Sequence, residues 1–171
     1  ETVLVDCDPQ GNTSSWLLET KYAPEYQLAD VLLGNATLKR ALVQVEPTLS
    51  VLPTFGLSHT LNDYGKSGLA SEPFIIADTL ASLTADVCIL DMGPGFGNIE
   101  QAALLATDEV ILVMTPEYFG LDGLQTWDSN IKRIERGMRV KIHYERLVIN
   151  GLNRSIAQMR EVAGEATASS Q

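Results

Sequence analysis

Short apolar runs rich in β-branched residues recur along the chain, and each run ends in polar or loop-forming residues. Runs of this kind predict β-strands that are covered on both faces, because few polar positions interrupt them. We expect such core strands at residues 2–5, 86–92, 109–115 and 145–150, and a shorter strand at 49–53. Because these strands are far apart in sequence, the segments between them decide how they are connected.

The connecting segments carry apolar residues at helical spacing, which predicts helices between the strands. We expect helices at residues 14–18, 27–33, 37–43, 74–85, 99–107 and 124–136. Strands that alternate with helices favour an α/β fold with a doubly wound, mostly parallel sheet and helices on both faces. The segment 54–73 is rich in Gly, Ser and Asn and is expected to be an exposed loop. Loops of this length are often functional, but the sequence does not indicate what this one does.

Composition adds that the chain is globular and acidic. Its 171 residues suit one domain, and 45% apolar with 20% charged residues excludes a disordered chain. No apolar run reaches the roughly 18 residues that a membrane span requires. A net charge of −10 argues against a protein that coats nucleic acid with its whole surface. Cys7 and Cys88 lie in apolar strands and are expected to be reduced core thiols of a cytoplasmic protein.

Acidic residues follow two of the core strands. Asp6 and Asp8 end the first strand, ahead of Pro9 and Gly11, and Asp91 ends the strand at 86–92. Carboxyl ends of parallel strands meet at one edge of a sheet, where ligands bind. Acids at strand ends hold Mg²⁺ in phosphate-handling folds, although Asp, Pro and Gly are also ordinary turn residues. Both interpretations remain open on these residues alone.

Glycines after Asp91 add a second feature to this edge. Gly93, Gly95 and Gly97 form a loop whose backbone could approach a phosphate closely. A third loop, 116–123, follows the strand at 109–115 and is expected at the same edge.

Three strings in this order resemble signatures of the ParA/MinD family of P-loop ATPases, and the resemblance is greatest to the ParA branch. They are VLVDCDPQGNTSSWLL, VCILDMGPGFGN and TDEVILVMTPEYFGLDGL. The resemblance covers residues 2–150 and is poor between 54 and 80. It implies a P-loop NTPase-like sheet and an ATPase that uses ATP and Mg²⁺.

The resemblance also implies roles for individual residues. Asp91 is similar to the Walker B carboxylate that holds Mg²⁺ through a water, and Asp6 would support the same ion. Asp8 resembles the residue that positions the water attacking the γ-phosphate. Nucleotide-binding positions would be Gln10, Asn12, Gly93, Pro94 and Asn150, the last being similar to an adenine-contacting Asn.

The sequence departs from the family pattern at two places, and both bear on the ATPase activity that the resemblance implies. Gly93 stands where the family usually has a proline, which should loosen the loop and leave its carboxylate in place. The glycine-rich Walker A loop with its lysines is absent from the 171 residues, and it would be expected upstream of Glu1. We therefore expect a fragment, residues 1–171 of one ParA-like domain, which cannot hydrolyse ATP by itself.

Basic residues concentrate near the end of the chain. Half of the twelve lie within fifteen positions: Lys132, Arg133, Arg136, Arg139, Lys141 and Arg146. They could be a solvated helix face, or a footprint for DNA phosphates as in the family, with Lys132, Arg133, Arg136 and Arg139 the candidate contacts. Membrane attachment would use an amphipathic C-terminal helix, and the sequence after residue 150 does not show that pattern, so no membrane partner is expected.

Two functions from different classes remain open. The first is an ATP-dependent switch that positions a chromosome, a plasmid or a protein compartment such as a carboxysome. It would act as a homodimer on the bacterial nucleoid, binding DNA non-specifically, with a ParB-like or cargo adaptor that stimulates hydrolysis. The second is a degenerate ParA-like adaptor that hydrolyses nothing and binds partners through residues 54–73.

Overall fold

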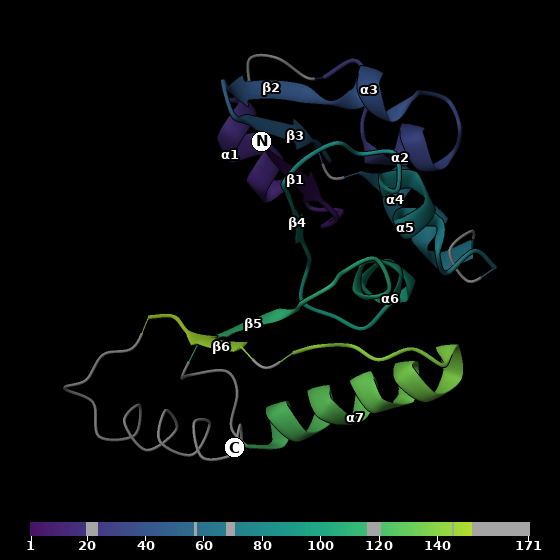
Figure 1. The fold of residues 1–171 in the computed structure, drawn as a ribbon, viewed down its shortest axis with the longest axis vertical. Coiled ribbons are helices and arrows are strands. Elements are labelled where there is room, and N and C mark those ends of the chain that lie inside the picture. Colours follow the sequence, from purple (N-terminus) through teal and green to yellow (C-terminus); the bar gives the residue numbers. More distant parts are fainter. Residues whose placement is uncertain (20–23, 57, 68–70, 116–120, 145, 152–171) are drawn as a thin grey trace. The chain divides into compact units, whose positions relative to one another are not determined.

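The computed structural model describes residues 1–19, 24–56, 58–67, 71–115, 121–144 and 146–151 (Figure 1). The chain forms two compact units, Glu1–Thr107 and Asp108–Gln171. Each unit is described by itself below. The expectation of a single domain over 1–171 stays a prediction.

The first unit contains a four-stranded sheet with the strand order β2-β3-β1-β4 (Figure 1). Its strands are β1 (Thr2–Asp6), β2 (Val43–Glu46), β3 (Leu49–Leu52) and β4 (Val87–Asp91). β1 pairs in parallel with both β3 and β4, and β2 pairs antiparallel with β3. The expected mostly parallel α/β fold is confirmed.

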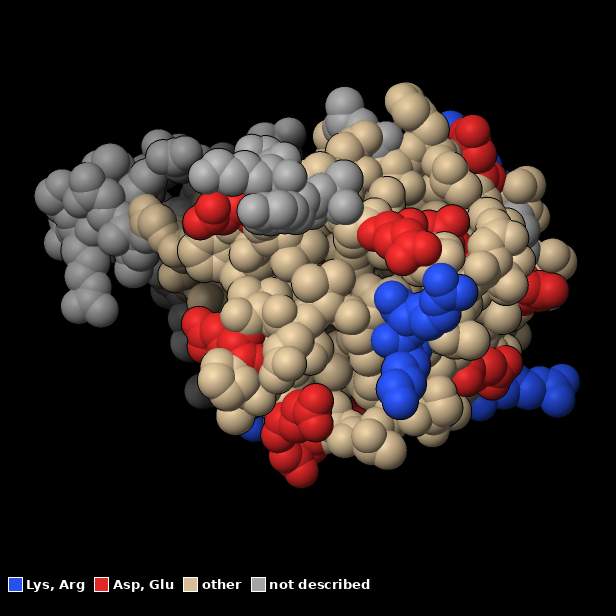
Figure 2. All heavy atoms as spheres, turned by 90° about the horizontal axis from the view of Figure 1, so that it is seen from above, with Lys and Arg blue, Asp and Glu red and all other residues tan. Residues whose placement is uncertain are grey.

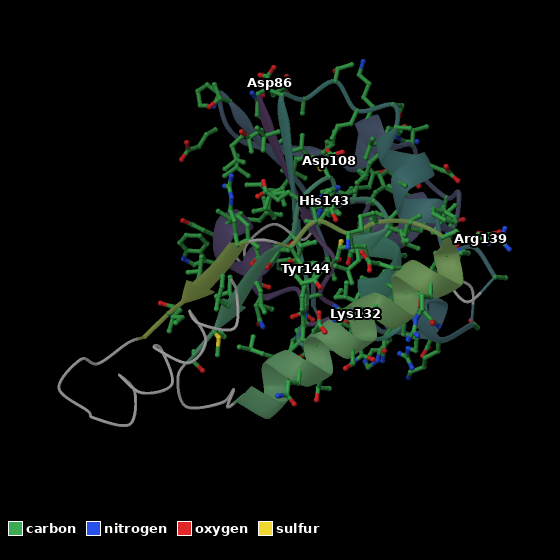
Figure 3. The ribbon with its side chains drawn as sticks, turned by 60° about the horizontal axis from the view of Figure 1, so that its bottom comes forward. Asp86, Asp108, Lys132, Arg139, His143 and Tyr144 are labelled. Carbon is green, nitrogen blue, oxygen red and sulfur yellow. The ribbon has the colours of Figure 1, made fainter. Side chains whose placement is uncertain are left out.

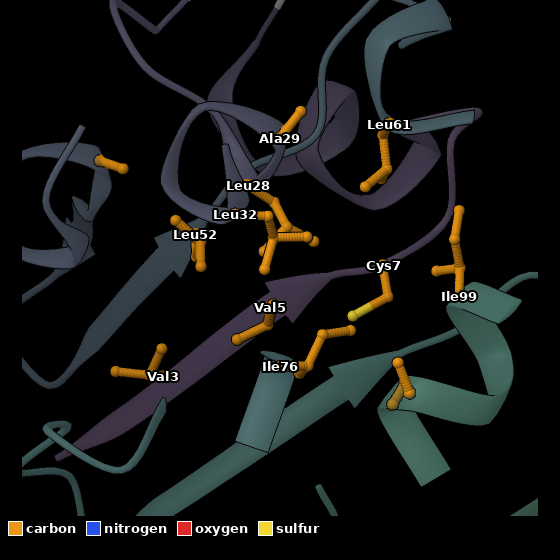
Figure 4. Close-up of a cluster of buried hydrophobic side chains, with 13 residues drawn as sticks. Val3, Val5, Cys7, Leu28, Ala29, Leu32, Leu52, Leu61, Ile76 and Ile99 are labelled. Carbon is orange, nitrogen blue, oxygen red and sulfur yellow. The ribbon is translucent and has the colours of Figure 1, made fainter. Parts of the chain in front are cut away.

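The helices of this unit are α1 (Asn12–Leu18), α2 (Leu28–Leu32), α3 (Leu38–Ala41), α4 (His59–Ser67), α5 (Ile75–Leu80) and α6 (Asn98–Leu104). Their apolar side chains bury one face of β1, which carries Val3 and Val5, and Cys7 just beyond the end of the strand belongs to the same cluster (Figure 4). Against that face lie side chains from four helices: Leu28, Leu32, Leu61, Ile76 and Ile99. Full burial of each large aliphatic side chain contributes about 1.5–3 kcal/mol, so this cluster fixes β1 at the centre of the sheet.

The second unit pairs β5 (Ile111–Met114) in parallel with β6 (Arg146–Ile149), and α7 (Leu121–Met138) lies between them in sequence. Ile131 and Ile134 on α7 are buried, which gives the helix an apolar side. Among the helices in the described ranges, none is both long enough and apolar enough to cross a membrane.

Three expectations about local structure were wrong. The helix expected at 37–43 ends at Ala41, and residues 43–46 form β2, which pairs with β3 through Val43, Gln44 and Glu46. The expected exposed loop 54–73 contains α4, which buries Leu61 and Gly65. Cys88 is exposed, unlike the buried Cys7, because β4 is the edge strand of the described sheet.

Candidate functional site

The candidate site lies in the first unit, where β1, β3 and β4 end at one edge of the sheet. The register pairs Val5 with Leu52 and Asp6 with Asp91, so all three strands end at the same level. We call the segments that follow them the Asp8 loop (residues 7–11), the Thr54 segment (53–56) and the Gly93 loop (92–97). The sequence predicted the Asp8 loop and the Gly93 loop at this edge, but it did not indicate the Thr54 segment.

The Asp8 loop and the Gly93 loop are in direct contact. The backbone N–H of Cys7 donates a hydrogen bond of 2.8 Å to the carbonyl of Asp91. The hydroxyl of Thr13 donates to Oδ2 of Asp91 over 2.6 Å. A Cβ placed on Gly93 would lie 3.2 Å from Cγ and Oδ1 of Asp8, so a side chain there would press on that carboxylate. The structure therefore brings together the two acids that the sequence placed 83 positions apart (91 − 8).

Asp8 has a local role in shaping its own loop. Its Oδ1 accepts a hydrogen bond of 2.9 Å from the backbone N–H of Gln10, and its carbonyl accepts one from Gly11. Gln10 and Asn12 are both exposed, and Asn12 is the first residue of α1. The two polar side chains predicted to bind nucleotide are thus accessible at this edge.

Asp6 has a different environment from Asp8. Its side chain is fully buried, and its carboxylate accepts hydrogen bonds from the backbone of Asp8 and from Ser14. Burial raises the pKa of this carboxyl, and the hydrogen bonds from Ser14 oppose that rise. The prediction that Asp6 supports a metal ion is untested. The hydrogen bonds that its carboxylate accepts in the structure all come from groups of the protein.

An acid that the sequence analysis missed lies against the Gly93 loop. A Cβ on Gly97 would lie 2.9 Å from Oε2 of Glu100, and one on Gly95 would lie 3.4 Å from Oε1. Glu100 stands in the first turn of α6 and its carboxylate folds back over these glycines. This negative charge opposes the close approach of a phosphate that the glycines suggested, unless a cation accompanies it. Pro94 is exposed in the same loop.

Magnesium fits the oxygen donors at this edge. Mg²⁺ usually keeps several waters and takes one or two carboxylates together with substrate phosphates. Asp91, Asp8 and the hydroxyl of Thr13 supply such donors, and within the described ranges no group of three or more His, Cys, Asp or Glu side chains forms an all-protein metal cage. The donor set suits an ion that is shared with a bound phosphate.

The remaining candidate residues belong to the second unit. The backbone N–H of Asn150 donates to the carbonyl of Met114, and its side-chain oxygen accepts from Gly151. Most of the third loop, residues 116–120, lies outside the described residues, as does the chain after 151.

Acidic partners neutralise three of the six clustered basic residues. Lys132 pairs with Asp128 at 2.6 Å, Lys141 with Glu135 at 3.1 Å and Arg146 with Glu109 at 2.8 Å.

Lys132, on α7, lowers the pKa of Asp128, and the hydroxyl of Tyr144, which donates a hydrogen bond to Asp128, lowers it further (Figure 3). For Arg133, Arg136 and Arg139 the described part of the chain shows no acidic partner within ion-pair distance.

Comparison with known proteins assigns the family. The model of the AAA_31 family, described as an AAA domain, matches residues 1–144. The chain belongs to this family of ParA/MinD-type P-loop ATPases. The resemblance read from the three sequence strings is thereby confirmed.

Curated relatives of this ParA/MinD-type chain include partition proteins. The chromosome partitioning protein ParA of Caulobacter vibrioides is 27% identical over 172 residues, a match that covers 97% of this chain and 64% of the relative. The chain therefore spans just under two thirds of the length of that relative.

Solved structures share the fold of this chain. A cobyrinic acid a,c-diamide synthase from Mycobacterium smegmatis, with bound ATP analog and magnesium, gives a TM-score of 0.83 at 22% identity and covers 98% of this chain and 69% of its own. A plasmid partition protein from Borrelia burgdorferi bound to AMPPNP gives 0.82 at 19% identity, covering 98% and 70%. The expected cofactors, ATP and Mg²⁺, are of the kinds bound in these neighbours.

Proposed function

We propose that the protein containing this chain is an ATP-dependent switch that positions or segregates cargo. It would dimerise with bound nucleotide, bind DNA non-specifically and release it on hydrolysis. The observation that carries this proposal is the contact between the Asp8 loop and the Gly93 loop, which places Asp8 beside Gly93 and joins Thr13 to Asp91. The partition proteins among its relatives support the cargo-positioning role.

Each residue at the sheet edge has a proposed part in this activity. Asp91 would hold Mg²⁺ through a water, and Asp8 would orient the water that attacks the γ-phosphate. When bound there, Mg²⁺ would supply positive charge to neutralise the negative charge on the phosphates. Gln10, Asn12, Gly93 and Pro94 would line the phosphate, and Asn150 would contact the adenine.

The two acids are expected to fail in different ways when replaced. In the full-length protein, Asp8→Ala should keep ATP binding and dimerisation but lower single-turnover hydrolysis by orders of magnitude, because positioning a nucleophile contributes several kcal/mol. Asp91→Ala should instead weaken binding of Mg²⁺-ATP. Asp78→Ala, an exposed acid on α5, serves as the matched control and should change neither quantity.

The outcomes of that experiment separate the two candidate functions. Near-parental hydrolysis by Asp8→Ala would refute the assignment of Asp8 as the water-positioning residue. A parent protein that binds nucleotide but never turns it over would instead support the non-hydrolysing adaptor. Dimerisation is followed by light scattering in the same samples.

Three arginines near the end of α7 are the proposed DNA contacts. Arg133, Arg136 and Arg139 are exposed, whereas the Lys132 ammonium is engaged by Asp128. The surface as a whole does not suit DNA, since the chain has a net charge of −10 and, on the face drawn in Figure 2, which labels none of these arginines, acidic side chains lie around a small basic group. DNA binding would therefore depend on a local patch and not on the whole surface.

Arg139 permits a test that separates binding from folding. Its φ of 57° is left-handed, a conformation that glycine adopts without strain and that costs other residues about 1–2 kcal/mol. Arg139→Gly should therefore keep or raise thermal stability and still weaken binding to any DNA sequence. Each lost phosphate contact should reduce the slope of log K against log salt by about 0.9.

A charge-matched control completes the DNA experiment. Arg133→Glu with Arg136→Glu should weaken binding strongly, whereas Lys39→Glu with Lys66→Glu changes the net charge equally at other exposed sites and should have a small effect. Equal losses for both pairs would show that net charge alone matters, and the arginines would then be only a solvated face.

The remaining parts of the proposal concern partners and place. We propose an adaptor similar to ParB, or one carried by the cargo, that stimulates hydrolysis, and an association with the bacterial nucleoid through DNA. Because one fold serves unrelated activities, as the synthase of the same fold illustrates, these partners need their own test. Fluorescent fusions of the parent and of Arg133→Glu with Arg136→Glu should differ in nucleoid association.

A further inference from the structure

Three polar side chains are buried behind the Asp8 loop. Asp6 at the end of β1, Ser14 in α1 and Thr54 after β3 are each at most 1% exposed. Within the described residues they are the buried polar or charged side chains, and all their buried polar atoms have hydrogen-bond partners. They stand in contrast to the apolar core on which β1 packs.

These side chains form a closed ring of hydrogen bonds. Oδ2 of Asp6 accepts from the Ser14 hydroxyl over 2.6 Å and from the Ser14 backbone N–H over 2.9 Å. Because the only hydroxyl proton of Ser14 goes to Asp6, its oxygen accepts from the backbone N–H of Thr54 over 3.0 Å. The Thr54 hydroxyl donates to the carbonyl of Asp6 over 2.6 Å and closes the ring.

The ring holds both ends of the segment that carries the proposed water-positioning residue. Oδ1 of Asp6 accepts from the backbone N–H of Asp8 over 3.2 Å, and Oδ2 anchors Ser14 on the far side of the Asp8 loop. Thr13, whose hydroxyl reaches Asp91, is adjacent to Ser14. Displacing the ring would therefore move Asp8 and Thr13 together.

We propose that Asp6, Ser14 and Thr54 act as a positioning unit for Asp8 and do not bind the metal ion. This inference rests on the proposed function. The carboxylate of Asp6 is buried, and three protein donors already hydrogen-bond to its two oxygens, which ties it to the Asp8 loop and to Ser14. A buried charge is retained where its hydrogen bonds specify a single geometry, which is what a loop carrying a catalytic acid requires.

The inference is tested by separating hydrolysis from metal binding in the full-length protein. Asp6→Asn and Ser14→Ala should lower the single-turnover rate by about tenfold or more, with Mg²⁺-ATP affinity within about threefold of the parent. Asp91→Asn should instead weaken the binding of Mg²⁺-ATP by more than that threefold. Ser14→Thr and Thr54→Ser keep a hydroxyl and should retain most of the rate that Ser14→Ala and Thr54→Val lose.

Two results would overturn the inference. If Asp6→Asn weakens Mg²⁺-ATP binding as much as Asp91→Asn does, Asp6 belongs to the metal site. If Ser14→Ala turns over at the parent rate, the ring does not position Asp8.

A second measurement does not depend on turnover. Amide hydrogen exchange at Asp8 or at Ser14 should be at least about tenfold faster in Asp6→Asn than in the parent, because asparagine keeps only one of the two acceptor oxygens that these N–H groups use. Absent turnover in the parent would refute the proposed function, and exchange would still test the ring. Unchanged exchange at both amides would overturn the inference by itself.

Discussion

Gly11 is the position in the Asp8 loop where the structure makes the sharpest demand on residue type. Its φ is +64°, and a Cβ added there would lie 2.4 Å from the backbone carbonyl oxygen of Thr54. Gly11→Ala therefore combines two costs. Left-handed backbone costs a residue with a Cβ about 1–2 kcal/mol, and overpacking against a backbone atom adds about 1–3 kcal/mol.

The clash cannot be relieved by a change of rotamer, because both atoms belong to or are fixed by the backbone. We expect Gly11→Ala to reduce the free energy of unfolding by roughly 2–5 kcal/mol. In a chain of this size each kcal/mol lowers the melting temperature by about 2–4 °C. Thermal unfolding followed by circular dichroism measures the shift.

Gly34 provides a matched control for the backbone term. Its φ is +75°, but nothing lies within 4 Å of an added Cβ, so Gly34→Ala should cost only about 1–2 kcal/mol. The difference between the two variants then isolates the contact with Thr54. If Gly11→Ala is no more destabilising than Gly34→Ala, the close packing of the Asp8 loop on the Thr54 segment is refuted.

Two further predictions concern Asp6 and the cysteines. Because burial raises the pKa of Asp6 above its ordinary value of 3.8, its stabilising contribution is present below that value and is lost as the pH rises. The unfolding free energy of the parent minus that of Asp6→Asn should therefore fall as the pH rises above about 4, and a rise with pH would contradict the assignment. In residues 1–171, Cys88 should react with a maleimide in the folded state and Cys7 only on unfolding, as mass spectrometry would show, since Cys7 is buried and burial raises its pKa. Equal reaction rates for both thiols would contradict this.

The order of elements could be predicted because its signals are local. An apolar β-branched run followed by Asp6 or Asp91 identifies a strand and its end within a few residues of sequence. The parallel pairing of β1 with β4 follows from the helices between them, and it confirms that the two acids meet at one edge. Both inferences needed no knowledge of the neighbouring side chains.

Local signals were insufficient where tertiary contacts outweigh intrinsic preference. The segment 54–73 contains the turn formers that favour a loop, yet α4 forms there because Leu61 is buried and Gly65 packs against Ile99. The side chain of Asn98 adds a hydrogen bond of 2.7 Å to the carbonyl of Gly65. A glycine inside a helix is unfavourable by itself, and only the contact with α6 explains it.

The sequence alone determined which chemical groups stand at the strand ends, because the period of the apolar residues fixes where each strand stops. Only the tertiary structure decided what those groups do to one another. Thr54 is 48 residues from Asp6 and Ser14 is eight, so no local pattern could show that they form one buried ring. Desolvation and hydrogen-bond geometry depend on such distant neighbours, and they give Asp6 an environment unlike that of Asp8, only two residues away.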